Sequence, residues 1–328
     1  MSRQAGSLNS NQRLLIGAHL LAEQAAMVSS MALVLSEMKC FGDGHPDAIE
    51  VTNTESYNFF CKKVDFLAHN GELSFLLGIP MTVFHELLQI SPTGTYKCSP
   101  TIRMTIFIKY LKEGVRQTGM NREVGLSQPT ISRIISSVSR DLVRVASSYI
   151  KFPSTIQELR SLQSASFSKV NRQGYLHAQM FRSGPLPEML HRLSVIGGCQ
   201  LIPGSNTPLL PILLADRGFG LSEHVITPYH GTNLTQENML FNRIHSNSRV
   251  VIENLFGIIR SRFGIFDTAL NLDPENSRAL IVSAAVIQNI IRGPMPSSSG
   301  LFESSPVVPN PYNSAKEQRE ALKAYVLN

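Results

Sequence analysis

Two acidic residues, Asp216 and Glu253, stand where a carboxylate could do chemistry. Asp216 follows the apolar run PLLPILLA, which is typical of a buried strand that delivers an acid at its carboxyl end. Glu253 is the single acid in SRVVIENLFGIIRSRF, a stretch with the apolar periodicity of a helix. Because Mg²⁺ and Mn²⁺ prefer hard oxygen ligands, the two carboxylates could converge on a divalent cation.

A second interpretation of Glu253 stays open. On a helix, Arg249, Glu253 and Gly257 lie four residues apart on one face, and the remaining positions are mostly apolar. A carboxylate on a face meant for packing needs a partner, and Arg249 could supply it from one turn away. In that case Glu253 is half of a structural ion pair and binds no metal.

The histidines and cysteines show no spacing typical of a metal site. The four cysteines are far apart and contain no C-x-x-C pair, which also argues against a disulfide framework. We predict packing or surface positions for the histidines, which include His224, His230 and His245.

The stretch TGMNREVGLSQPTISRIISSV, residues 118–138, predicts two helices joined by a tight turn. Gly125 marks the turn, Ser127 is placed to cap the second helix, and Pro129 falls in the first turn of that helix. This pattern fits a helix-turn-helix and, equally well, a plain hairpin of two helices in a bundle.

In a DNA-binding helix-turn-helix, side chains near the start of the second helix face base edges or phosphates. Here these side chains would be Gln128, Thr130 and Arg133. The chain carries 30 lysines and arginines against 24 acidic residues, a formal charge of +6. This mild excess suits a polyanionic partner but does not require one.

The elements that must position these residues fall into four regions. Residues 1–57 hold an apolar helix and a linker, 58–150 a block of short helices, 151–293 an α/β segment, and 294–328 a flexible Pro/Ser-rich tail with a terminal helix. Polar residues interrupt the helix at 14–35 before it reaches the ~20 apolar residues of a membrane span, so we predict no membrane contact. Docking of this helix into a partner's groove is the alternative.

The sequence resembles the PIF/Harbinger transposase-derived nuclease family in five stretches, which together cover most of residues 60–292. They read IRMTIFIKYLKEGVRQTGMNREVGLSQPTISRIISSV, HAQMFRSGPLPEML, LLADRGFGLSEHVITPY, LTQENMLFNRIHSNSRVVIENLFGIIRSRFGIF and IVSAAVIQNIIR. The resemblance implies an α/β fold, in which an N-terminal helical block with a helix-turn-helix-like pair precedes an RNase H-like DDE nuclease core.

The resemblance also implies roles for particular residues. Asp216 matches the family's third Asp and Glu253 its terminal Glu, so both are expected to be catalytic and to bind Mg²⁺ or Mn²⁺. Three arginines are expected near the DNA, namely Arg249, Arg260 and Arg262. The expected partners are DNA and a Myb-like DNA-binding protein, the expected location is the nucleus and cytoplasm, and no small-molecule substrate is expected.

Two acids of the family pattern are missing from this chain. The family carries its first acid in a strand reading roughly Ile-Asp-Gly-Thr and its second in a His-Asp pair, but no Asp occurs between Phe152 and Arg182, and His177 is followed by Ala178. Because a two-metal site needs several oxygen ligands, we expect an impaired nuclease. We also expect a truncated, poorly formed or rearranged core with exposed edges on the strand at 209–215. A non-catalytic DNA- or protein-binding module is the alternative.

Overall fold

The computed structural model describes most of the helical block and most of the chain after residue 211. The described residues are 49–94, 98–150, 188, 190–192, 195, 198–201, 206–210, 212–293 and 307–327, the side chains of Gln200, 249–253 and Val307 excepted. Three predictions lie outside these ranges: the helix at 14–35, the structure of the stretch without Asp between 152 and 182, and the first part of the Pro/Ser-rich tail.

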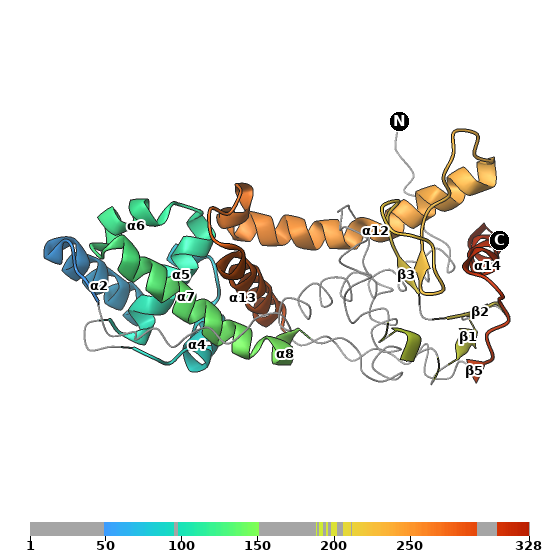
Figure 1. Ribbon diagram of the computed structural model, residues 1–328. Helices are drawn as coiled ribbons and strands as arrows, with labels where there is room; N and C mark the ends of the chain where they lie inside the picture. Colours follow the sequence, from blue (N-terminus) through green and yellow to red (C-terminus); the bar gives the residue numbers. More distant parts are fainter. Residues whose placement is uncertain are drawn as a thin grey trace, which may run out of the picture. The chain divides into compact units, whose positions relative to one another are not determined.

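Two compact units divide the chain, and each is described by itself (Figure 1). The helical unit comprises Val34–Lys151 and Gly257–Pro294, and the α/β unit comprises Met1–Leu33, Phe152–Phe256 and Met295–Asn328. The helical unit is therefore discontinuous in the sequence. Its second segment falls in the region that we predicted to be nuclease-like, and the predicted division into four regions stays a prediction.

The helical unit consists of short helices joined by tight turns. Their bounds are α2 Thr54–His69, α3 Leu73–Leu77, α4 Met81–Ile90, α5 Pro100–Glu113, α6 Gln117–Val124, α7 Gln128–Arg144, α8 Ala146–Tyr149, the 3-10 turn η1 Gly264–Asp267 and α13 Pro274–Arg292. The breaks predicted at 78–80 and 91–94 fall between α3 and α4 and between α4 and α5. Within the described ranges, no helix combines the length and the apolar character needed to cross a membrane.

Helix α5 forms the centre of the helical unit, because every residue from Ile102 to Leu111 is buried. Ser99 caps its start: the Ser99 hydroxyl accepts a hydrogen bond from the Ile102 N–H at 3.3 Å. Gly114 ends it with a left-handed φ of 63°, and a Cβ at this position would lie 2.5 Å from the carbonyl oxygen of Gly264. The turn after α5 therefore packs directly on the backbone of η1.

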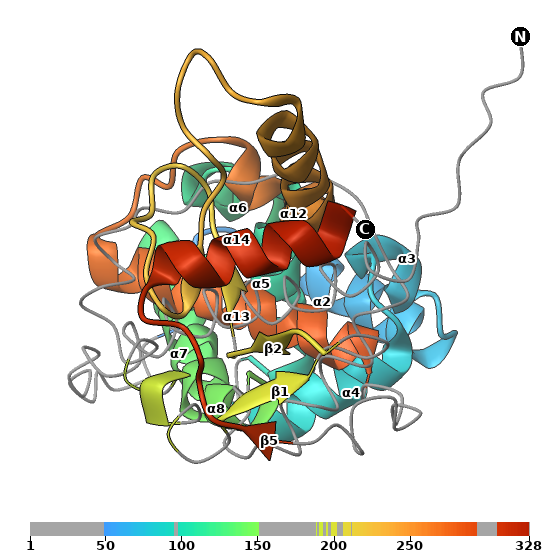
Figure 2. The same cartoon turned by 90° about the vertical axis from the view of Figure 1, so that its right-hand side faces the viewer.

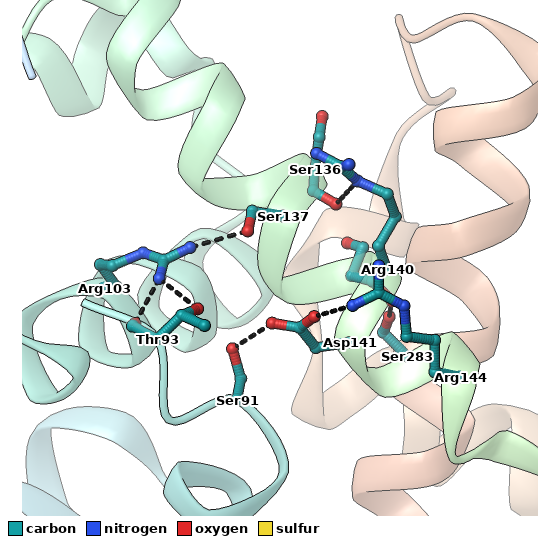
Figure 3. Close-up of polar contacts among 10 residues, drawn as sticks. Ser91, Thr93, Arg103, Ser136, Ser137, Arg140, Asp141, Arg144 and Ser283 are labelled. Carbon is teal, nitrogen blue, oxygen red and sulfur yellow. Dashed lines mark hydrogen bonds and ion pairs between the residues drawn. The ribbon is translucent and has the colours of Figure 1, made fainter. Parts of the chain in front are cut away.

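A buried polar network ties α7 to α5 and to the turn after α4 (Figure 3). The Arg103 guanidinium donates to the carbonyl oxygen of Thr93 and, at 2.6 Å, to its hydroxyl. Nearby, the Ser91 hydroxyl donates to Asp141 at 2.6 Å, and Arg144 forms an ion pair with the other oxygen of Asp141 at 2.9 Å. Burial lowers the pKa of Arg103, although the negative charge of Asp141 opposes that shift.

Helix α13 packs along α7, although more than a hundred residues separate the two in the sequence. The Asn289 amide donates to the Tyr149 carbonyl oxygen at 3.0 Å, and the Ser136 hydroxyl donates to Asn276 at 3.2 Å. Most of the apolar residues of α13 between Ala279 and Ile290 are buried. This helix is therefore a core element of the helical unit, which explains why the unit takes up the second segment.

The described residues of the α/β unit form two small sheets. An antiparallel sheet has the order β2 (Pro208–Leu209), β1 (Cys199–Leu201) and β5 (Val307–Val308), and a parallel pair joins β3 (Leu213–Leu214) to β4 (Val225–Ile226). In the parallel pair, Leu213 is level with Val225 and Leu214 with Ile226. The apolar run 208–215 thus contributes buried strand residues directly before Asp216, as predicted.

The first part of α12 (Gln236–Arg262) and α14 (Ala315–Leu327), both labelled in Figure 2, pack against the β3–β4 pair. They share one apolar cluster with the strands, formed by Ile212, Leu214, Ile226, Tyr229, Phe241, Ile244, Leu322, Tyr325 and Val326. The predicted terminal helix is present, and together with β5 it belongs to the α/β unit. The buried face of α14 packs on the β3–β4 pair, and β4 occupies one edge of β3; the exposed edges that we expected at 209–215 otherwise stay a prediction.

Candidate functional site

Asp216 lies at the end of β3 with its side chain 5% exposed. Its carboxylate oxygen Oδ1 accepts the Gly218 N–H at 2.8 Å, and its carbonyl oxygen accepts the Phe219 N–H at 3.2 Å. Both bonds hold the turn that follows the strand. The strand therefore delivers the acid as predicted, and one carboxylate oxygen is used by the turn.

Glu253 lies on α12, a helix of 27 residues that includes the whole predicted helical stretch. The backbone thus confirms the helix, and Asp216 and Glu253 both belong to the α/β unit. The side chains of Arg249 and Glu253 lie outside the described part of the structure. Both interpretations of Glu253, as the partner of Arg249 or as a metal ligand, remain predictions.

The described residues around Asp216 do not include a complete metal site. Among them, Asp216 belongs to no group of three or more histidine, cysteine or acidic side chains able to hold an ion. A two-metal site needs several oxygen ligands to hold two ions about 4 Å apart. The Glu253 side chain and residues 151–187 lie outside the described part of the structure, so the metal role of Asp216 stays a prediction.

The predicted turn between α6 and α7 has the expected caps. Gly125 adopts a left-handed φ of 76°, and the Ser127 hydroxyl accepts the Thr130 N–H at 3.3 Å. Pro129 falls in the first turn of α7. The Asn121 amide donates to the Leu126 carbonyl oxygen at 2.7 Å, which closes the turn from the α6 side.

The three residues of α7 that were expected to face DNA differ in their exposure to solvent. Gln128 and Arg133 are exposed, and the Gln128 amide donates to Gln117 at 2.7 Å. Thr130 is only 1% exposed, and its hydroxyl accepts the Glu50 N–H at 3.1 Å. The side chain of Thr130 therefore holds the turn, which corrects the expectation that it faces DNA.

Of the three arginines expected near DNA, Arg249 has a side chain outside the described part of the structure, and Arg260 and Arg262 end α12 within the helical unit. Arg260 is exposed and forms an ion pair with Asp267 at 2.7 Å. Arg262 is half-buried, its Nε has no hydrogen-bond partner among the described residues, and burial lowers its pKa. Arg260 is therefore the more accessible of the two to a polyanion.

The structure also shows a group that the sequence analysis missed. His191, Glu223 and His224 each offer one ligand atom, and these atoms lie within 4.8 Å of one another. Two other histidines have the predicted roles, since His230 is exposed, whereas His245 is buried with Nε2 3.1 Å from the Ile226 carbonyl oxygen. No spacing rule could have paired His191 with His224, because β1 to β3 lie between them in the sequence.

Comparison with known proteins shows what part of the chain is similar to a known family. Residues 191–289 match the family model described as DDE superfamily endonuclease, a range that includes Asp216 and Glu253. No solved structure matches this chain.

The chain is also similar to curated relatives named Putative nuclease HARBI1. The rat (Rattus norvegicus) protein is 26% identical and the human (Homo sapiens) protein 25% identical, each over 268 residues, with 66% of this chain and 76% of the relative covered. The Xenopus laevis protein is 23% identical over 235 residues, with 58% of this chain and 67% of the relative covered. The predicted resemblance to the Harbinger transposase-derived nucleases is thus confirmed.

The alignment with the rat protein is longer than the part of this chain that it covers. The comparison with the rat protein extends over 268 residues, yet 66% of this 328-residue chain is about 216 residues. About 50 positions of the relative therefore stand opposite gaps in this chain.

Proposed function

We propose that this chain is a DNA-binding relative of the divalent-metal-dependent transposase-derived endonucleases, with impaired catalysis. The observation that carries the proposal is the sequence between Phe152 and Arg182, which contains no Asp where the family resemblance expects two acids. The gaps of this chain against its relatives support it. Asp216 and Glu253 alone would hold one ion at best.

DNA binding, in this proposal, uses exposed cations of the helical unit. Arg133 lies exposed in the first turns of α7, after a Ser127 cap and the Gly125 turn, which is where a helix-turn-helix contacts DNA. Arg260 is also exposed, and its pairing with Asp267 is solvent-accessible and exchangeable for a phosphate. Contacts of this kind release counterions, so the affinity should fall steeply with salt.

A DNA-binding titration with the full chain tests the proposal. Fluorescence anisotropy with a labelled duplex, over about 50 to 200 mM salt, should give an affinity that falls with salt. Arg133→Gln and Arg260→Gln should each reduce the salt slope by about 1. Lys316→Gln, a change at an exposed position of α14, should leave the slope unchanged. If the chain has no affinity for DNA even at the lowest salt, the binding proposal is wrong.

A cleavage assay tests the catalytic part separately. The full chain is incubated with supercoiled DNA and Mg²⁺ or Mn²⁺, and we expect no more nicking than in samples without protein. Asp216→Asn, which keeps an oxygen to accept the Gly218 N–H, is the matched variant. Metal-dependent cleavage that this variant loses would show that the site is active and would refute the proposed impairment.

A second candidate function, protein binding, rests on exposed aromatic side chains of the helical unit. Phe59 and Phe66 on α2 are 70% and 62% exposed and lie seven residues apart on one helix face, and Phe75 on α3 is 83% exposed. Exposed apolar groups of this size are typical of interaction sites. A Myb-like DNA-binding protein that brings the chain to the nucleus is the partner that we propose.

Co-precipitation with such a Myb-like protein tests this candidate. We expect Phe59→Ser and Phe66→Ser to abolish capture, while Lys316→Gln preserves it and all variants remain folded. Equal capture of the wild-type chain and both phenylalanine variants would exclude this surface as the contact.

A further inference from the structure

The geometry points to a transition-metal site in the α/β unit that is separate from the acids of the nuclease resemblance. We propose that His191, Glu223 and His224 together bind a divalent transition-metal ion, best matched by Zn²⁺. The proposal goes beyond DNA binding and does not depend on it.

The three ligand atoms already lie close together. They are within 4.8 Å of one another, and the two imidazole rings have centroids 6.4 Å apart at an interplanar angle of 67°. Ligands at about 2.1 Å from a tetrahedral Zn²⁺ lie about 3.4 Å from each other. Because the side chains of His191 and Glu223 are exposed, small rotations can bring them to that spacing.

The backbone that carries two of the ligands is fixed on both sides. His224 is 8% exposed and directly precedes β4, and its carbonyl oxygen accepts the Leu213 N–H at 2.7 Å. The Glu223 carbonyl oxygen accepts a hydrogen bond from the Gln318 amide of α14 at 3.3 Å. The third ligand, His191, directly follows Leu190. Leu190 is 1% exposed, so it anchors the segment that carries His191 in the core. Hydrogen bonds to the backbone thus fix the Glu223–His224 side of the site, and the buried Leu190 fixes the His191 side.

The register of the parallel pair separates this site from Asp216. Leu213 is level with Val225, so His224 is level with Ile212 at the amino end of the β3–β4 pair. Asp216 follows the carboxyl end, four residues further along, which is about 13 Å in a strand. The histidine group and Asp216 therefore cannot share one ion.

The ligand set selects the class of metal. Two imidazoles and one carboxylate suit Zn²⁺, Cu²⁺, Ni²⁺ or Fe²⁺, whereas Mg²⁺ prefers oxygen ligands alone. Three protein ligands also leave the fourth position of a tetrahedral Zn²⁺ open to water or to another small ligand. A bound ion would link the segment around His191 to β4, and it should therefore stabilise the α/β unit.

A competition titration with the full, chelator-stripped chain tests the site. Zn²⁺ is added with a chromophoric indicator, and we expect one site that His191→Ala and Glu223→Gln each weaken by at least about tenfold, because even second-shell changes reach that size. His230→Ala removes an exposed histidine from the same region and should leave the affinity unchanged. Equal Zn²⁺ affinity in the wild-type chain and His191→Ala would overturn the proposal.

Two further measurements exclude other binding modes. Among the described residues Cys61, Cys98 and Cys199 are free thiols, which also bind zinc. Substitution with Co²⁺ should give a spectrum without thiolate charge-transfer bands, and strong bands of that kind would assign the ion to cysteine and refute the site. Zn²⁺ should also raise the thermal midpoint of the wild-type chain and of His230→Ala more than that of His191→Ala.

Discussion

The Arg103 guanidinium donates a hydrogen bond to the hydroxyl of Ser137 at 2.7 Å, and this bond joins α5 to α7 inside the helical unit (Figure 3). Arg103 is 4% exposed, so its charge is held by fixed partners and not by water. Buried charges of this kind are tolerated only when most of their donors are satisfied. The start of α7, where DNA binding is proposed, therefore belongs to a helix whose position depends on a buried arginine.

We expect Arg103→Lys to destabilise the helical unit by about 1–3 kcal/mol, because a lysine cannot reproduce the fork that reaches both Thr93 and Ser137. Urea unfolding followed by circular dichroism measures this loss. Arg122→Lys, at an exposed position of α6, is the control and should change the free energy of unfolding by less than about 0.5 kcal/mol. Similar values for the two variants would contradict the assigned role.

A glycine pair tests the turn between α6 and α7. Gly125→Ala should destabilise by about 2 kcal/mol or more, because φ is 76° and the new Cβ would lie 2.5 Å from the Asn53 carbonyl oxygen. Gly119→Ala, inside α6 with no atom within 4 Å of a new Cβ, should stabilise by about 0.5–1 kcal/mol. Opposite shifts of the thermal midpoint are expected, and shifts of the same sign would contradict the geometry.

The Asp273 cap at the start of α13 should make the stability of the protein depend on pH. The Asp273 carboxylate accepts the Asn276 N–H at 3.0 Å, and this bond lowers the pKa of Asp273 in the folded state. A lowered pKa means that the stabilisation is present above the unfolded pKa of about 3.9 and is lost as pH falls through the folded value. Asp273→Ala should cost about 1 kcal/mol at neutral pH.

Asp273→Asn is the matched control, because asparagine caps a helix nearly as well and does not titrate there. The difference in unfolding free energy between the wild-type chain and Asp273→Asn should shrink or reverse from neutral pH to about pH 3. A difference independent of pH would show that the carboxylate charge contributes nothing to the cap.

Leu322 tests whether α14 holds the β3–β4 pair. It is 2% exposed within the shared apolar cluster, so Leu322→Ala should cost about 2–5 kcal/mol. Hydrogen exchange should show the loss first at the amides of Leu213 and Ala215, which donate across the pair. Lys316→Ala on the exposed side of α14 should leave this protection unchanged.

Local patterns allowed the sequence to predict several of these features. Ser127 and Gly125 act within one turn of the chain, so their residue types alone indicate the cap and the turn. Asp216 follows a short buried strand, and a run of apolar residues is enough to predict that arrangement.

Features that depend on distant contacts were not predictable. Thr130 looks like a surface residue in the helical pattern, but Glu50 and Ser127 enclose its hydroxyl. Helix α14 looks like a charged tail until its apolar face meets β4, and His191 shows its neighbours only once the chain is folded. Periodicity gives the face of a helix but not the element that this face contacts.

The two-segment construction of the helical unit has a consequence for how it folds. The Ser283 hydroxyl donates to the Ser139 carbonyl oxygen at 3.4 Å across a sequence separation of 144 residues. Docking of α13 onto α7 must therefore close a long loop. The entropic cost of closing it grows only slowly with loop length. Contacts between residues so far apart in the sequence nevertheless form slowly during folding. We expect folding of the intervening residues to leave less free chain between the two segments and so to lower that cost. We therefore expect damage to the α/β unit to weaken the helical core as well, because α13 follows the insertion in the sequence.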